Sequence, residues 1–271
     1  LQSDASQRMT KDIMNRAYIT PKRIVTKYAG CKNNLIKDEH YLLERGNGQS
    51  EMNRKKCCIM TSTETEKASL LLDFGSELHG GLKLVMGSSS RREPSLVRIR
   101  FGESVGEANS STSNSEWKVG FSTDDHAKRD IIMEIPRDGM IEIGNTGFRF
   151  VRLDLLQNNA TISLKEISAI LRYRDIPYLG SFECNDQRLN KIWITGAYTV
   201  HLNMQEFLWD GIKRDRVVWL GDMHPELMTI SRVFGYNEVI PNSLDLACKQ
   251  FTFNESMNGK SEYRLWYIIN Q

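Results

Sequence analysis

The stretch Phe148-Arg-Phe-Val-Arg-Leu-Asp-Leu155 alternates apolar and charged residues almost one by one. Successive side chains of a β-strand point to opposite faces, so this pattern predicts a strand with one face in a core. Similar short runs, bounded by Gly, Asn and Asp, lie on both sides of it: Ser69–Phe74, Gly81–Met86, Leu96–Phe101, Gly139–Ile143 and Ile162–Ile167. Runs about ten residues apart with turn residues between them are typical of an all-β sandwich. We therefore predict a β-sandwich domain over residues 61–178.

Two segments around these runs lack the strand pattern. Residues 1–60 are polar and carry a basic patch at Asn53–Lys56, which is typical of a solvated face. We expect an irregular segment there that precedes the sandwich or packs on it. Residues Ser104–Asp125 are rich in Ser, Asn, Thr and Gly, which predicts a long loop. Its Trp117 and Phe121 offer flat apolar faces, either for stacking a sugar or for fixing the loop on the sandwich.

The hydrophobic period changes from two to that of a helix after Ser181. Asn185-Asp186 is a good N-cap, and the next apolar residues fall on one face of a helix predicted over 186–207. Pro225 can begin a second helix and Pro241 a third, because proline is tolerated at the first helical position. The fold class is therefore multidomain β plus α, with helices over residues 179–271.

The composition of the 271 residues excludes several classes of protein. Charged residues make up 26% and the formal net charge is +2, a balance that indicates neither disorder nor a nucleic-acid-binding protein. No apolar run approaches the roughly 18 residues that a membrane span requires. The five cysteines form no CxxC pair, and their odd number argues against a disulfide framework.

Charged residues and two tryptophans gather in the connector between the first two predicted helices, Leu208–Glu226. This connector holds Asp210, Lys213, Arg214, Asp215, Arg216, Asp222, His224 and Glu226, together with Trp209 and Trp219. Interleaved carboxylates can have their pKa values driven apart, as acid–base catalysis requires, and an indole is a platform for a sugar ring. The alternative is an ion-pair network that joins two domains.

Other motifs point to no cofactor. The histidines show no metal-ligand spacing such as HExxH, and the sequence holds no glycine-rich phosphate loop of either common type. We therefore expect neither a metal nor a cofactor.

The spacing Asp210-x3-Arg214-Asp215-x3-Trp219-x-Gly221-Asp222 resembles the signature of bacterial α-L-rhamnosidases, the inverting hydrolases of glycoside hydrolase family 78. The likeness extends to the strands and to the entry into the first helix, covering about residues 65 to 271: Asp73–Gly81, Arg98–Ser104, Gly147–Leu153 and Gly180–Trp193. It implies a β-sandwich followed by the first helices of an (α/α)6 six-hairpin toroid, here apparently truncated.

The resemblance also implies roles for the connector residues. Asp215 stands at the position of the general acid, usually a glutamate, and its carboxyl group reaches one methylene less far. Asp210 and Asp222 match carboxylates that bind rhamnose hydroxyls, and Arg214 and Trp219 match the residues flanking them. The family's general base is a glutamate much later in the barrel, so the resemblance places it outside this chain and this chain alone is expected to be inactive.

Further expectations depend on the same resemblance. The substrate would be a rhamnose-containing oligo- or polysaccharide, and the location periplasmic or secreted. The apolar third helix and Tyr263–Ile269 would be exposed in a truncated barrel, which predicts self-association. Two alternatives stay open: a non-catalytic carbohydrate-binding β-sandwich protein, and a barrel acting on another sugar.

Overall fold

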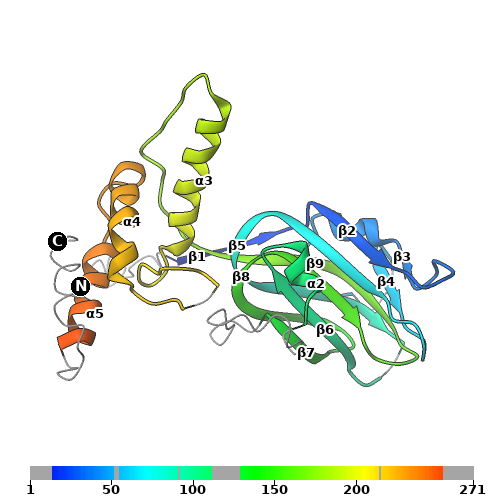
Figure 1. The fold of residues 1–271 in the computed structure, drawn as a ribbon. Coiled ribbons are helices and arrows are strands. Elements are labelled where there is room, and N and C mark those ends of the chain that lie inside the picture. The colour runs from blue at the N-terminus through cyan, green and yellow to red at the C-terminus, as the bar shows by residue number, and fades with distance from the viewer. Residues whose placement is uncertain (1–13, 52–54, 91, 112–128, 214, 253–271) are drawn as a thin grey trace, which may run out of the picture. The chain divides into compact units, whose positions relative to one another are not determined.

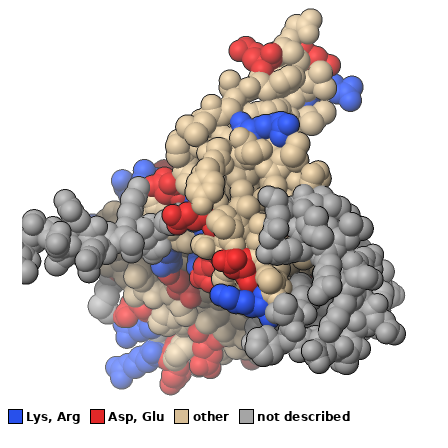
Figure 2. Space-filling view, turned by 90° about the vertical axis from the view of Figure 1, so that its left-hand side faces the viewer, with Lys and Arg blue, Asp and Glu red and all other residues tan. Residues whose placement is uncertain are grey.

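The computed structural model describes residues 14–51, 55–90, 92–111, 129–213 and 215–252 (Figure 1). The described residues divide into two compact units, one within residues 17–171 and the other within residues 1–16 and 172–271. Among the described residues, no helix has the length and apolar character to cross a membrane. On the face shown in Figure 2, acidic and basic side chains are interspersed, in keeping with the balanced composition.

Antiparallel strands joined in one sheet dominate the first unit. Along the sheet the strands follow the order β3-β4-β9-β5-β8-β6-β7, while β1 pairs with β9 and β2 with β5 (Figure 1). A short 3-10 helix lies at Glu39–Leu43 and a one-turn helix, α2, at Val105–Asn109. The strands are β1 (Met14–Ile19), β2 (Arg23–Tyr28), β3 (Ile36–Lys37), β4 (Cys58–Thr61), β5 (Ser69–Ser89), β6 (Ser95–Gly102), β7 (Asp130–Ile135), β8 (Gly139–Leu155) and β9 (Thr161–Arg174).

The strands β5 and β8 are each longer than the sequence pattern predicts, because each joins two of the predicted runs. Their pairing shifts register between Asp73 and Leu78 and again between Gly80 and Leu82. At the second shift the two backbones approach closely, and a Cβ atom on Gly81 would lie 2.4 Å from the carbonyl oxygen of Ile143. Glycine therefore lets one bent strand continue where the sequence pattern indicates two.

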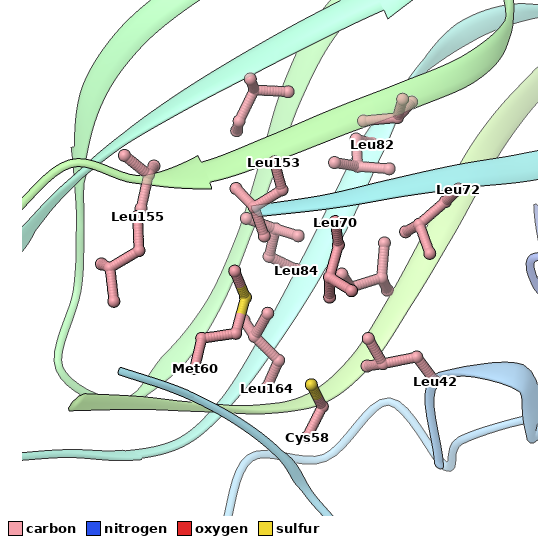
Figure 3. Close-up of a cluster of buried hydrophobic side chains, with 14 of the residues drawn as sticks. Leu42, Cys58, Met60, Leu70, Leu72, Leu82, Leu84, Leu153, Leu155 and Leu164 are labelled. Carbon is pink, nitrogen blue, oxygen red and sulfur yellow. The ribbon is translucent and has the colours of Figure 1, made fainter. Parts of the chain in front are cut away.

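Most apolar side chains in the core of this unit come from β4, β5, β6, β8 and β9, in a β-sandwich-like arrangement. Figure 3 shows leucines of β5, β8 and β9 in one cluster with Met60 and Cys58 of β4. Phe148 is fully buried and packs edge-on against Phe74 and Phe101, with ring centroids 5.9 and 4.9 Å away. This unit confirms the β part of the predicted multidomain β-plus-α fold class.

The segment 1–60 differs from its predicted irregular character. Its described part contains β1, β2 and β3, and β4 begins at Cys58. Strand β2 pairs antiparallel with β5, from Arg23 opposite Asp73 to Tyr28 opposite Ser69. These strands are missed because most of their side chains are exposed or only half-buried, so their hydrophobic alternation is weak. Within the predicted loop Ser104–Asp125, α2 is present, while Trp117 and Phe121 lie outside the described residues.

The second unit contains three helices, α3 (Gln187–Asn203), α4 (Leu220–Val233) and α5 (Val239–Thr252). The Asp186 side chain caps α3, as predicted, by accepting the backbone N–H of Arg188 at 2.8 Å. Helix α4 begins five residues before Pro225, where the sequence predicts its start, and Pro225 lies inside it. Hydrogen bonds from the backbone N–H groups of Asp222 and Met223 to the carbonyl oxygen of Trp219 establish this earlier first turn. Asp222 and Glu226 therefore lie on a helix, not in a connector.

An aromatic cluster joins the segment before α3 to the helices. The His201 ring nitrogen Nε2 lies 2.7 Å from the carbonyl oxygen of Arg174, and Nδ1 lies 3.2 Å from the Tyr178 hydroxyl. The Tyr178 ring packs edge-on against Phe234. Burial lowers the pKa of His201, which favours the neutral form of its ring.

The contact of Gly180 with the end of α4 gives a prediction for the helical unit. The backbone N–H groups of Leu179 and Gly180 both donate to the Val233 carbonyl oxygen. A Cβ atom on Gly180 would lie 1.9 Å from the carbonyl oxygen of Arg232. Gly180→Ala must therefore displace this segment, and we expect it to destabilise the unit by about 1–3 kcal/mol in urea unfolding.

Gly196 supplies the matched control for that substitution. It lies in α3 and a Cβ there meets nothing within 4 Å, so Gly196→Ala should stabilise the unit by about 1 kcal/mol through helix propensity. Equal effects of the two substitutions would contradict the packing at Gly180.

Candidate functional site

The candidate site begins where α3 ends, at Asn203. The Asn203 carbonyl oxygen accepts the backbone N–H groups of Gln205, at 2.9 Å, and Trp209, at 3.0 Å, which folds the chain back on the helix end. The N–H of Leu208 donates to the Ser243 hydroxyl of α5 at 2.8 Å. The start of the connector is therefore attached to two helices, which gives the following residues a rigid base.

Asp210 closes a loop over residues 210–217. Its backbone N–H donates to the carbonyl oxygen of Val217, and its carboxylate Oδ1 accepts the N–H of Val217, both at 3.1 Å. Inside the loop the Arg216 Nε donates to the Ile212 carbonyl oxygen at 3.0 Å, and the guanidinium lies 5.5 Å from the centre of the Trp209 ring. The cation–π contact between Arg216 and Trp209 thus fixes one face of the loop.

Two consecutive residues in this loop have left-handed backbone conformations. Asp215 has a φ of 60° and Arg216 one of 53°. For residues other than glycine such a conformation costs of order 1–2 kcal/mol, and it is retained where the surrounding structure holds it. Strain of this kind gathers at functional sites, so Asp215 is a candidate for a residue whose position matters chemically.

Three carboxylates come together around the loop. Burial raises the pKa of Asp210, and the nearby charges of Asp215 and Asp222 raise it further. Asp222 is exposed in the first turn of α4, where the helix dipole favours a negative charge. Carboxylates that share one small region are suited to binding sugar hydroxyls and to proton transfer.

An exposed indole borders these carboxylates. Trp219 precedes α4 and is 44% exposed. A Cβ on Gly221 would lie 2.8 Å from the Trp219 Nε1, so the indole lies close over the backbone at this glycine. A glycine at position 221 leaves room for the indole, and part of the ring stays exposed and open to a ligand.

The helical unit resembles a known protein family. Residues 177–257 match the family described as the bacterial alpha-L-rhamnosidase 6 hairpin glycosidase domain. The resemblance to bacterial α-L-rhamnosidases is confirmed. No protein of curated function matches the sequence.

Two solved rhamnosidase structures share the fold. A rhamnosidase from Klebsiella oxytoca with rhamnose bound matches at a TM-score of 0.64 and 18% identity, over 86% of this chain and 44% of that one. A family 78 rhamnosidase of Bacillus sp. GL1 matches at 0.60 and 19%, over 79% of this chain and 22% of that one. This chain thus spans less than half the length of either rhamnosidase.

The rhamnosidase-like signature maps onto the structure as follows. Asp210, Asp215, Trp219 and Asp222 lie in or beside one loop, so the structure brings them into one region. Arg214 and the C-terminal apolar stretch Tyr263–Ile269 lie outside the described residues. No group of three or more His, Cys, Asp or Glu within the described part could hold a metal ion.

One further carboxyl group belongs to this region of the rhamnosidase-like unit. Glu226 lies four residues after Asp222 on α4 and is only 8% exposed. The Asn203 Nδ2 donates to its Oε1 at 3.2 Å. Burial raises the pKa of Glu226 to about 8, against the effect of this hydrogen bond and with the help of the Asp222 and Asp210 charges. The sequence shows Glu226 among the connector charges but assigns it no role.

Proposed function

We propose that this loop is the rhamnose-binding and acid-donating part of an inverting glycoside hydrolase of the α-L-rhamnosidase type. The observation that carries the proposal is the meeting of Asp210, Asp215 and Asp222 around a strained turn beside an exposed indole, in the segment that matches the six-hairpin domain. We assign proton donation to the leaving oxygen to Asp215. An inverting hydrolase also needs a base carboxylate about 6.5–9.5 Å from the acid, and the proposal leaves that base unassigned.

The other residues have binding roles in this proposal. Asp210 and Asp222 accept hydrogen bonds from rhamnose hydroxyls, Arg214 orients these carboxylates and Trp219 packs against the sugar ring. The loop closure by Val217 supports the role of Asp210, because it fixes the carboxylate before a ligand arrives. The substrate class is a rhamnose-containing glycan, and we propose a periplasmic or secreted location.

Rhamnose binding tests the proposal on the chain itself. We expect isothermal titration calorimetry to detect L-rhamnose binding, and Asp222→Asn to weaken it about 10- to 100-fold, because a hydrogen bond to a charged group contributes about 1.5–3 kcal/mol.

Asp245→Asn is the matched control, since Asp245 is an exposed aspartate on α5 in the same unit and should leave affinity unchanged. Binding that survives the change at Asp222 would contradict the site. Tighter binding of another deoxy-hexose would support the proposed site but assign it a sugar other than rhamnose.

A further inference from the structure

A buried carboxyl group lies beneath the candidate sugar site with no role in the chemistry above. Glu226 follows Asp222 by four residues, which places the two side chains one turn apart on the same face of α4. Asp222 is exposed and Glu226 is buried, so the pair runs from the surface of the site into the helical unit. Burying a carboxyl group costs free energy unless the group is hydrogen-bonded or uncharged. The burial of Glu226 therefore requires an explanation.

The residue that donates a hydrogen bond to Glu226 also contacts the backbone at the start of the loop. The donor is the side-chain amide of Asn203, the last residue of α3, which is itself only 8% exposed. The carbonyl oxygen of the same Asn203 accepts the backbone N–H of Trp209, the residue before Asp210. Asn203 therefore connects the Glu226 carboxyl group to the backbone of Trp209 and of the next residue, the binding carboxylate Asp210.

Among the residues that the structure describes, two charged groups act on Glu226, and both are negative. Its own helix contributes Asp222 and the loop contributes Asp210, both of which are carboxylates, whereas α3 contributes the neutral amide of Asn203. His201, two residues earlier on α3, has its ring nitrogens at Tyr178 and at the carbonyl oxygen of Arg174. A charge on Glu226 would therefore face two like charges in a dry environment.

We propose that Glu226 is a positioning residue of the sugar site, whose uncharged carboxyl group holds Asn203 and, through it, the backbone of Trp209 and Asp210. The inference rests on the proposed function, because it assigns a role at that site. When Glu226 loses its proton, the hydrogen bond from Asn203 persists, but the buried charge repels Asp210 and Asp222 and attracts water. This repulsion displaces the two binding carboxylates, and affinity for the sugar falls as the pH rises.

The pH dependence of L-rhamnose affinity tests this role. The wild-type chain should lose affinity about fivefold or more between pH 6.5 and 9.5, with a midpoint near pH 8 that follows the pKa of Glu226. Glu226→Gln keeps the size of the side chain and a hydrogen-bond acceptor but cannot ionise. Its affinity should match that of the wild type at pH 6.5 and change less than about twofold across the range. Equal pH profiles of the two proteins would overturn the proposal.

Nuclear magnetic resonance of the wild-type chain keeps the proposal testable if the Gln variant does not fold or if rhamnose does not bind. The Glu226 carboxyl carbon and the backbone amide signals of Trp209 and Asp210 should titrate together near pH 8. A Glu226 midpoint near the ordinary value for glutamate, or amide signals that do not follow it, would overturn the positioning role. Absence of rhamnose binding with a shared titration near pH 8 would instead refute the proposed function and leave the coupling in place.

Discussion

Asp215→Asn should lower the hydrolysis of an alkyl α-L-rhamnoside by about 100- to 10,000-fold, the range that general acid catalysis contributes. The amide keeps the shape of the side chain but has no acidic proton for the leaving oxygen. An aryl rhamnoside with a nitrophenol leaving group needs less protonation, so its hydrolysis should fall much less. The measurement is kcat/KM for both substrates with the natural protein that contains this sequence.

Two further variants separate proton donation from a general disturbance of the loop. Asp215→Glu restores an acid with a reach one methylene longer, so it should retain activity that Asp215→Asn lacks. Asp245→Asn changes an exposed aspartate outside the loop and should leave kcat/KM unchanged. Equal losses on the alkyl and the aryl substrate, or activity retained in Asp215→Asn, would remove Asp215 from the role of acid.

The sequence predicts the β-then-α order of the fold well, because periodicity within one element is a local property. It fails where an element depends on its partners. Strands β5 and β8 continue through two register shifts, and at the second of them the Gly81 backbone approaches Ile143 across the sheet. Strands β1 and β2 are largely exposed, so their residues carry little of the pattern that marks a buried strand.

The candidate site shows the same division. The spacing from Asp210 to Asp222 locates the loop, since the residues concerned are close in the sequence. The role of Glu226 depends on α4 beginning at Leu220, and Pro225 instead indicates a later start. Once the earlier start is known, Glu226 and Asp222 share a helix face. The burial of Glu226 and its bond to Asn203, 23 residues away, follow from packing and not from the local sequence.

Phe148→Ala should cost the β-rich unit about 3–5 kcal/mol of its free energy of unfolding, the range for removing a buried aromatic ring. Phe148 is 0% exposed, and its ring packs edge-on against those of Phe74 and Phe101. The substitution therefore removes both aromatic contacts and leaves a cavity in the core. Urea unfolding followed by circular dichroism gives the change, with the midpoint shifted and the slope unaltered if the folded state keeps its compactness.

Met140→Ala is the matched control for this substitution, because Met140 lies on the same strand β8 and is 59% exposed. Its loss should stay within about 0.5 kcal/mol, as for surface substitutions in general. The difference between the two variants compares the loss of a buried side chain with the loss of an exposed one on the same strand. A loss below about 1 kcal/mol for Phe148→Ala would mean that the core around Phe148 is not packed as the structure shows.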